Sequence, residues 1–223
     1  MTSVAVVVPA GGAGTRLGRS TPKQFLRLGG VPILVATVRH FLRHPAVRAV
    51  VVAAPAGHVA RTRALLPARR LPLITVVEGG ATRQESVHRA LQATPGDVDV
   101  VVVHDAVRPF ITARLLDEVI RAAAAHGAAI CALPIAETVK RVADGFVQAT
   151  VDREGLVAVQ TPQAFRAALL REAHGKAQRD GVAATDDAML VERLGQPVRV
   201  VAGLADNVKI TTPEDLRRAR RRR

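Results

Sequence analysis

The segment with the clearest chemical signature is a glycine-rich loop that directly follows a short apolar run near the N-terminus. It reads Pro9-Ala10-Gly11-Gly12-Ala13-Gly14-Thr15-Arg16-Leu17-Gly18, and Pro22-Lys23-Gln24 follows shortly after. Because glycine has no Cβ, the backbone N–H groups of such a loop can approach a phosphate closely. Arg16 and Lys23 place two positive charges beside it. The segment therefore predicts a site for a phosphorylated ligand.

Two familiar phosphate-binding motifs do not fit this loop. No Gly-Lys-Ser/Thr follows the glycines, as a P-loop requires. Leu17 stands where the third glycine of the dinucleotide-binding fingerprint belongs. The loop is therefore neither a P-loop nor a dinucleotide-binding fingerprint.

Four further polar segments narrow the interpretation. They are Gly79-Gly80-Ala81-Thr82-Arg83-Gln84-Glu85-Ser86-Val87, His104-Asp105-Ala106-Val107-Arg108-Pro109, Thr150-Val151-Asp152-Arg153 with Gln160-Thr161-Pro162-Gln163, and Asn207-Val208-Lys209-Ile210-Thr211-Thr212-Pro213-Glu214-Asp215. The first loop resembles the nucleotide loop of the sugar-nucleotidyltransferase superfamily. With the other segments, in this order and spacing, the sequence resembles the 2-C-methyl-D-erythritol 4-phosphate cytidylyltransferase family from Val4 to Leu216.

The resemblance implies an activity. The family transfers a cytidylyl group from CTP to a sugar-alcohol phosphate in non-mevalonate isoprenoid synthesis, and it releases pyrophosphate. Mg²⁺ is the implied cofactor, and CTP and a polyol phosphate are the implied partners. The expected enzyme is thus a nucleotidyltransferase.

The resemblance also assigns roles to residues. The catalytic positions fall on Arg16, Lys23, Arg153 and Lys209. The polyol phosphate positions fall on Asp105, Arg108, Thr138 and Thr185, together with Arg153 and Lys209. The CTP-binding positions, including those around the cytosine, fall on Pro9, Ala10, Gly11, Gly12, Gly14, Gly80, Ala81, Ser86 and Ala106.

Physical chemistry agrees with a role for these cations. A phosphate monoester is already anionic near pH 7, since its second pKa is about 6. Its oxygen can therefore attack without a general base. Two unit charges at contact repel by about 4 kcal/mol at an effective dielectric constant of 20, so several fixed cations must bring this anion to a triphosphate. Arg153 can grip a phosphate with two parallel hydrogen bonds, whereas a lysine acts as a point charge.

At three places in the sequence, charged residues allow more than one interpretation of their role. Adjacent side chains at a strand end point in opposite directions, so Asp105 is expected to face the site and His104 to pack inside. Asp105 then binds either Mg²⁺ or substrate hydroxyls. Asp186-Asp187 is interpreted as a helix start capped by Thr185 rather than as a metal site. Arg83 either orients the cytosine loop or pairs along a helix.

The elements that must position these residues alternate along the chain. Strands are expected at Val4–Val8, Ala49–Ala53, Leu73–Val77, Val98–Val103, Ala129–Ala132 and Val198–Val201. Helices are expected at Pro32–Leu42, Val59–Leu66, Thr82–Ala93, Thr112–His126, Gln163–Ala177, Asp186–Leu194 and Pro213–Arg220. Valine-rich runs between helices indicate a doubly wound, mostly parallel α/β sheet, a Rossmann-like nucleotidyltransferase fold, with ligands at the carboxyl ends of the strands.

One segment interrupts this alternation. Thr138–Ala143 and Phe146–Val151 both have strand character, and Asp144-Gly145 between them predicts a two-residue hairpin turn. An isolated hairpin is marginally stable in water, so this arm, about residues 135–152, must pack on its own domain or on another subunit. The resemblance implies that it crosses to the second subunit of a homodimer and delivers Thr138 and Arg153 there.

Composition limits the remaining possibilities. The 223 residues, 48% of them hydrophobic, suit a single domain, expected at 1–216. Aromatic residues make up only 2%, so a nucleic-acid site built on stacked aromatic side chains is not expected. Cys131 is the only cysteine, and no signal peptide or membrane span is recognisable, so the protein is expected in the cytoplasm and not in a membrane.

The formal charge of +13 is concentrated at one end, because six of the residues in the segment 217–223 are arginine. This basic tail is interpreted as the solvated end of the last helix. Two other functions stay open. One is a cytidylyltransferase for another polyol phosphate such as ribitol 5-phosphate, and the other is a basic nucleotide- or nucleic-acid-binding module without catalysis.

Overall fold

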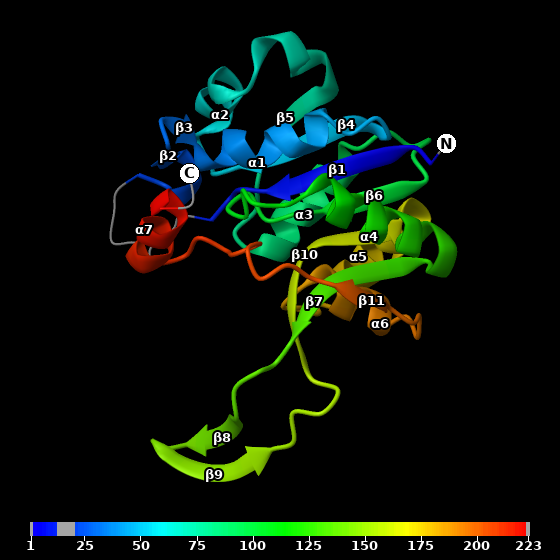
Figure 1. Cartoon of the computed structure of the whole chain (residues 1–223). Coiled ribbons are helices and arrows are strands. Elements are labelled where there is room, and N and C mark those ends of the chain that lie inside the picture. The colour runs from blue at the N-terminus through cyan, green and yellow to red at the C-terminus, as the bar shows by residue number, and fades with distance from the viewer. Residues whose placement is uncertain (1, 13–20, 222–223) are drawn as a thin grey trace.

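A seven-stranded sheet forms the centre of the molecule. The structure, a computed structural model, describes residues 2–12 and 21–221. The strands lie in the order β11-β7-β10-β6-β1-β4-β5, and β10 alone among the strands of this described sheet runs antiparallel to its neighbours, β6 and β7 (Figure 1). The predicted doubly wound, mostly parallel α/β fold is confirmed.

The elements have the following bounds. The strands of the large sheet are β1 (Val4–Pro9), β4 (Val47–Ala54), β5 (Ile74–Glu78), β6 (Val100–Val103), β7 (Ala128–Pro134), β10 (Val157–Arg166) and β11 (Arg199–Ala202). The helices are α1 (Ile33–Leu42), α2 (Val59–Leu65), α3 (Arg83–Gln92), α4 (Ala113–His126), α5 (Ala167–Arg179), α6 (Asp187–Glu192) and α7 (Pro213–Arg221). Two short helical turns, η2 (Lys23–Phe25) and η3 (Ala68–Leu73), and two small strand pairs, β2 (Arg27–Leu28) with β3 (Val31–Pro32) and β8 (Val139–Ala143) with β9 (Phe146–Val151), complete the described chain.

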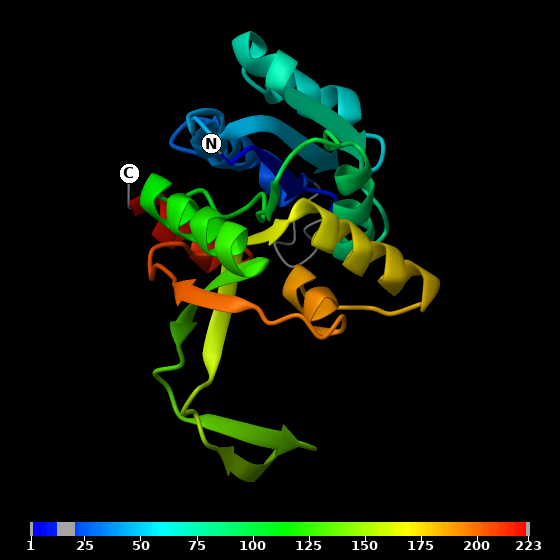
Figure 2. The ribbon, with the colours of Figure 1, turned by 90° about the vertical axis from the view of Figure 1, so that its right-hand side faces the viewer.

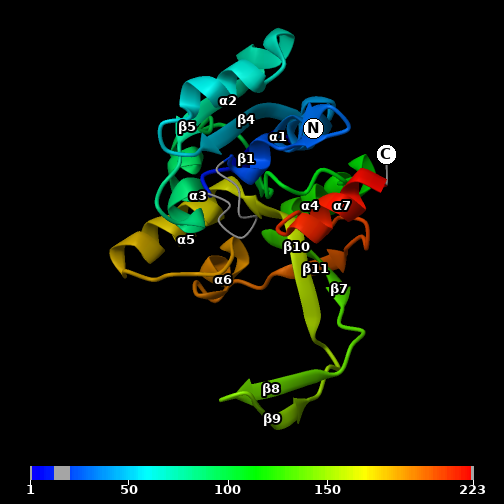
Figure 3. The ribbon, with the colours of Figure 1, turned by 90° about the vertical axis from the view of Figure 1, so that its left-hand side faces the viewer.

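The helices cover both faces of the sheet, and each face has its own core. In β1, Val4, Val6 and Val8 pack into the core under α1 and α4, whereas Ala5 and Val7 face the core under α3, α5 and α6. Figures 2 and 3 show the sheet between these two helix layers. Both cores are reached by one continuous apolar run because successive side chains of a strand point to opposite faces.

The strand β10 is the main difference from the sequence-based expectation. A helix was expected from Gln163 to Ala177, but residues 157–166 are a strand and the helix α5 begins only at Ala167. This strand contains Pro162, which removes a hydrogen-bond donor from the ladder, and the register with β7 shifts between Gln160 and Gln163. Because β10 contains polar residues and a proline, the sequence pattern did not predict this buried central strand.

The predicted hairpin arm is present. Asp144 and Gly145 both have positive φ, 53° and 81°, as the turn between β8 and β9 requires. The arm extends away from the sheet on two linkers that continue β7 and β10 (Figure 1). Its apolar side chains are exposed: Phe146 is 74% accessible and Val147 is 62% accessible.

The C-terminal helix α7 packs against β2 and the start of α1. Its Leu216 and Ala219 are buried in a third cluster with Leu28, Ile33 and Ile210. The boundary expected between a domain ending at 216 and a tail at 217–223 therefore falls inside this helix. Within residues 2–12 and 21–221, no helix is long and apolar enough to cross a lipid bilayer.

Candidate active site

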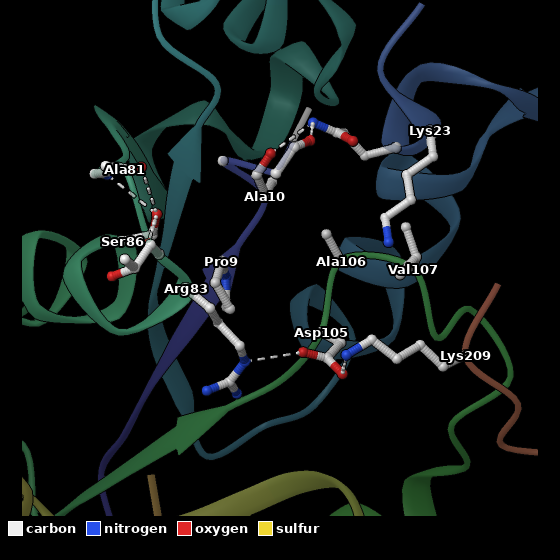
Figure 4. A pocket seen from close by; sticks show the side chains of 15 residues that line it. Pro9, Ala10, Lys23, Ala81, Arg83, Ser86, Asp105, Ala106, Val107 and Lys209 are labelled. Carbon is white, nitrogen blue, oxygen red and sulfur yellow. Dashed lines mark hydrogen bonds and ion pairs between the residues drawn. The ribbon is translucent and has the colours of Figure 1, made fainter. Parts of the chain in front are cut away.

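A cavity opens where β1, β5 and β6 end, at the carboxyl edge predicted for ligand binding. It contains eleven of the residues that the sequence assigned to the site (Figure 4). They are Pro9, Ala10, Gly11, Gly12, Lys23, Gly80, Ala81, Ser86, Asp105, Ala106 and Lys209. Gly14 and Arg16, which were also assigned to it, lie outside the described residues.

The first wall is the loop after β1. The backbone N–H of Ala10 donates to Ala53 O at 2.8 Å, which continues the pairing of β1 with β4. A Cβ on Gly11 would lie 2.8 Å from Ser86 Oγ, so any larger residue would displace the serine. The loop after β1 is thus pressed against the start of α3, and its backbone borders the cavity.

The second wall is the turn between β5 and α3. Ser86 is buried, and its Oγ accepts from Gly80 N at 3.1 Å and donates to Thr82 O at 2.9 Å. Thr82 and Glu85 form a reciprocal capping box at the start of α3. A Cβ on Gly80 would lie 2.3 Å from the Cβ of Glu85. The turn is therefore fixed, and its residues Gly80, Ala81 and Thr82 line the cavity.

Lys23 projects into the cavity from the short helical turn η2 (Figure 4). The next residue, Gln24, is buried, and its Nε2 donates to Ala10 O at 2.6 Å. This bond ties the lysine-bearing turn to the loop after β1. Gln24 belongs to the Pro-Lys-Gln segment, but no sequence pattern indicates that its amide performs this task.

Asp105 lies at the centre of a cluster of cations. Its Oδ2 is 2.9 Å from Lys209 Nζ and 3.4 Å from Arg108 Nε, and its Oδ1 is 3.3 Å from Arg83 Nε. Burial alone would raise the pKa of Asp105, but Lys209 and Arg83 outweigh burial and hold the pKa well below its usual range. The carboxylate stays ionised and is held from both oxygens.

His104 points away from this cluster, as predicted. It is fully buried against Phe41, with ring centroids 5.2 Å apart, and its Nε2 donates to Arg108 O at 3.0 Å. Burial lowers the pKa of His104 to about 4. This histidine packs neutral behind the loop and lies outside the cavity.

Residues from two later segments position the Asp105 loop. Thr161 Oγ1 accepts from Asp105 N at 3.1 Å, and Asn207 Nδ2 donates to Thr161 O at 2.7 Å. Asn207 O in turn accepts from Arg108 Nη1 at 2.6 Å. Thr161 and Asn207 lie in segments that the sequence singled out, yet only the fold shows that they meet.

A second, adjoining pocket shares Arg83, Asp105 and Lys209 with the first. It also contains Arg108 and Thr185, two of the residues assigned to the polyol phosphate. The two assigned subsites thus meet at a common wall, and that wall carries three charged side chains.

The helix start near Thr185 differs from the expectation. The N-cap of α6 is Asp186, whose side chain accepts from Met189 N at 3.0 Å, and Thr185 is exposed beside it. Asp187 is buried and faces inward, where it pairs with Arg83. Thr185 is therefore not the cap; it lines the second pocket, and its hydroxyl lies 4.0 Å from Met189 Sδ.

Thr138 and Arg153 do not join either pocket of this chain. Both are exposed and lie at the base of the hairpin arm, where Arg153 Nη1 donates to Ala136 O. Their distance from the cavity follows from the way the arm projects from the sheet (Figure 1).

The residues around the cavity do not fit a protein-bound metal. No group of three or more His, Cys, Asp or Glu side chains that could hold an ion occurs within residues 2–12 and 21–221. Asp105, the one assigned ligand, has Lys209, Arg83 and Arg108 around it, and these cations would repel a divalent ion. The geometry favours substrate hydroxyls as the partners of Asp105.

Comparison with known sequences gives a consistent result. The sequence model of the IspD family, 2-C-methyl-D-erythritol 4-phosphate cytidylyltransferase, matches residues 4–221. A cytidylyltransferase of that name from Symbiobacterium thermophilum is 51% identical over 218 residues, which cover 97% of this chain and 91% of the relative. The one from Geobacter metallireducens is 45% identical, covering 96% of this chain and 94% of the relative.

Solved structures agree with the sequence comparison. The crystal structure of the enzyme of that name from Thermus thermophilus superposes with a TM-score of 0.82 at 40% identity, over 99% of this chain and 98% of that one. The one from Francisella tularensis has a TM-score of 0.85 at 30% identity, over 98% of both chains.

Proposed function

This chain belongs to the 2-C-methyl-D-erythritol 4-phosphate cytidylyltransferase family, and from that membership and the site we propose how it acts. It is a nucleotidyltransferase that transfers the cytidylyl group of CTP to 2-C-methyl-D-erythritol 4-phosphate. The products are 4-diphosphocytidyl-2-C-methyl-D-erythritol and pyrophosphate. The reaction is the CTP-dependent step of the non-mevalonate isoprenoid pathway.

The chemical step exchanges one phosphate bond for another. An oxygen of the methylerythritol phosphate forms a bond to the α-phosphorus of CTP. The bond from that phosphorus to the oxygen bridging to the β-phosphate breaks, and pyrophosphate leaves with the electron pair. The attacking oxygen is already deprotonated near pH 7, so no side chain has to remove a proton.

The observation that carries this proposal is the placement of Lys23 and Lys209 in one cavity, with Lys209 at the wall shared by the two pockets. Lys23 lies on the side of the loop after β1, where it can neutralise the triphosphate. Lys209 and Arg108 line the second pocket, where they would bind the phosphate of the polyol. Cations that are already in place when charge develops at the α-phosphate stabilise the transition state without having to reorganise.

Asp105 gives the polyol a fixed hydrogen-bond acceptor. An ionised carboxylate accepts from hydroxyl groups, and its three cationic neighbours keep it ionised. Together with Thr185 it would orient the chain of hydroxyls, while Arg108 and Lys209 bind the phosphate. The loops after β5 and β6 would contact the cytosine, at Gly80, Ala81, Ser86 and Ala106.

We propose that Mg²⁺ arrives on the phosphates of CTP. A bound Mg²⁺ draws the triphosphate oxygens into one geometry and neutralises part of their charge. Mg²⁺ takes few ligands from proteins and keeps several waters, which agrees with the absence of a carboxylate cluster in the described part of the chain.

We further propose a homodimer in which the arm completes the partner's site. The arm carries Thr138 and Arg153 away from its own pockets and exposes Phe146 and Val147 to solvent. A two-stranded ribbon with such a surface gains stability by packing on another subunit. Since CTP is a cytoplasmic nucleotide, the enzyme is expected to work in the cytoplasm.

One assay tests the proposed function. Pyrophosphate release is measured with CTP, UTP, ATP and GTP, each combined with methylerythritol phosphate and with ribitol 5-phosphate. Release with CTP and methylerythritol phosphate, and at least about tenfold lower kcat/KM with every other pair, is expected. Higher kcat/KM with ribitol 5-phosphate than with methylerythritol phosphate would show that the substrate is another polyol phosphate. No release with any pair, together with tight and salt-sensitive binding of duplex DNA, would indicate a binding module instead.

A further inference from the structure

Asp187 is a buried charge that the reaction does not use directly. It lies at the start of α6 and is 1% exposed, whereas its neighbour Asp186 caps the helix. A carboxylate in such a place is costly unless all of its oxygens are partnered. The partners of Asp187 therefore indicate why the fold tolerates it.

Each carboxylate oxygen of Asp187 has one partner. Oδ1 accepts from His174 Nε2 at 3.0 Å, and Oδ2 accepts from Arg83 Nη1 at 2.8 Å. The backbone N–H of Asp187 also donates to Gln163 Oε1 at 3.2 Å. His174 is itself buried in α5, so the carboxylate is fixed from the side opposite the cavity.

Arg83 connects this buried carboxylate to the active site. While its Nη1 is held by Asp187, its Nε lies 3.3 Å from Asp105 Oδ1 at the wall shared by the two pockets. Burial would lower the pKa of Arg83, but Asp187 and Asp105 outweigh burial and raise the pKa above its usual value. The guanidinium stays charged between the two carboxylates.

The shared use of Arg83 fixes the orientation of Asp105. An arginine with one carboxylate partner tends to grip it with two parallel hydrogen bonds. Here the guanidinium is divided between two carboxylates: Asp187 holds Nη1, which fixes the guanidinium in place, and Nε contacts Asp105 Oδ1. The carboxylate plane of Asp105 is then set between Arg83 on Oδ1 and Lys209 on Oδ2.

We propose that Asp187 is a positioning residue of the transfer reaction, which acts through Arg83 to orient Asp105 toward the polyol. This inference rests on the proposed function and deepens it. Asp187 lines neither pocket, so its influence on the polyol phosphate passes through Arg83. Without it, the guanidinium of Arg83 would lose the partner that fixes its position, and Asp105 Oδ1 would no longer be held in one orientation toward the substrate hydroxyls.

The test is a set of variants assayed in the full-length protein. Asp187→Asn keeps the volume of the side chain and removes its charge. We expect the KM for methylerythritol phosphate to rise about tenfold, as for the loss of a hydrogen bond to a charged group, and the KM for CTP to change less than about twofold. The matched control is Asp180→Asn, which removes an exposed carboxylate paired with Lys176 at the end of α5, and it should match the wild type.

A double variant separates positioning from a purely structural role. Because Asp187 acts through Arg83, Asp187→Asn should have no further effect on the KM for the polyol phosphate in an Arg83→Gln background. If the two substitutions together raise the KM for the polyol phosphate by the product of their separate effects, the inference is overturned. An equal rise of the KM for CTP and the KM for the polyol phosphate in Asp187→Asn would also overturn it. If Asp187→Asn does not fold, Arg83→Gln is the variant that tests the inference. It should raise the KM for the polyol phosphate and leave the KM for CTP unchanged, and any other result overturns the inference.

The activity of the wild type in the same assay distinguishes failure of the proposed function from failure of the role given to Asp187. If the wild type releases no pyrophosphate from CTP and methylerythritol phosphate, the proposed function fails and this inference fails with it. If the wild type is active and Asp187→Asn has an unchanged KM for the polyol phosphate, only the inference fails.

Discussion

Lys209 Nζ lies 2.9 Å from Asp105 Oδ2, although the two residues come from opposite halves of the chain. The contact places a cation and a hydroxyl acceptor side by side at the wall between the two pockets. This pair suits a substrate that is both a polyol and a phosphate. Loss of either side chain should therefore affect the polyol phosphate before it affects the nucleotide.

Removal of the Lys209 amine should affect the polyol phosphate more than CTP. Lys209→Ala should raise the KM for methylerythritol phosphate by at least about tenfold, because a charge-assisted contact to its phosphate is lost. The KM for CTP should change less than about threefold. Steady-state kinetics with each substrate varied in turn provide the measurement. Lys176→Ala, which removes an exposed lysine on α5, is the control, and an effect of Lys209→Ala confined to CTP would contradict its placement.

Removal of the Lys23 amine should slow the chemical step itself. Lys23→Ala should lower kcat by at least about 100-fold, as for the loss of one preorganised donor to developing negative charge. Single-turnover assays at saturating CTP separate this effect from weaker binding. Near-normal turnover would show that Lys23 does not contact the reacting phosphates.

Asp105 should orient the polyol without holding the metal. Asp105→Asn keeps the shape of the side chain but accepts fewer hydrogen bonds, so the KM for methylerythritol phosphate should rise at least about tenfold. The Mg²⁺ concentration that gives half-maximal activity should stay within about twofold of the wild-type value. A large shift of that concentration would instead make Asp105 a metal ligand.

The arm should join two subunits and complete the partner's site. The double variant Phe146→Ser with Val147→Ser should shift the protein from dimer to monomer in analytical ultracentrifugation and abolish most of the activity. Val200→Ser, at an exposed apolar residue on the edge strand β11, is the matched control and should remain dimeric.

Complementation tests whether Arg153 of the arm acts across that dimer. Arg153→Ala and Lys209→Ala should each have low activity when methylerythritol phosphate is well below the KM of the variant. Heterodimers isolated after co-expression with two different tags should regain activity, since one of their two sites then contains both side chains. Heterodimers as inactive as the parents would show that Arg153 serves its own chain.

His104 should make folding stability depend on pH in a defined window. Its pKa is lowered from 6.5 to about 4 by burial, so the unfolded chain binds a proton more readily than the folded one. This contribution is complete above about pH 6.5 and is lost as the pH falls toward 4, by up to about 1.4 kcal/mol per pH unit. Urea unfolding at several pH values should show this slope.

Variants identify the group responsible for that slope. His104→Gln, which can still donate to Arg108 O, should flatten it, whereas His126→Gln at an exposed position should not. Asp105 and Asp187, whose pKa values are also lowered, lose their contributions only at lower pH, below the usual range for a carboxyl group. An unchanged slope in His104→Gln would contradict a neutral buried histidine.

The loop after β1 and the turn before α3 could be recognised in the sequence because local rules determine their shapes. Gly11 and Gly80 occupy positions where a Cβ would collide with the next segment, and Thr82 and Glu85 form the cap that starts α3. Such features depend on neighbours that are few residues away or on a recognisable motif. The parallel strands were found for the same reason, since runs such as Val4–Val8 are buried on both faces.

The elements that the sequence did not predict depend on distant partners. The polar segment around Thr161 becomes a central strand only because β6 and β7 flank it and Asp105 and Asn207 bond to it. Asp187 has no local signal that distinguishes it from a capping residue. Its pairing with Arg83 and His174 exists only after three remote segments have packed together.

The segment at 207–210 has a consequence for the order of folding. Asn207 O holds Arg108, Ile210 N donates to Val107 O at 2.9 Å, and Lys209 pairs with Asp105, so the wall between the pockets is closed by a segment about 100 residues further along the sequence. Contacts between such distant segments form late, because a long loop must be closed before they are made. A refolding polypeptide should therefore complete the cap at the start of α3 earlier than this wall.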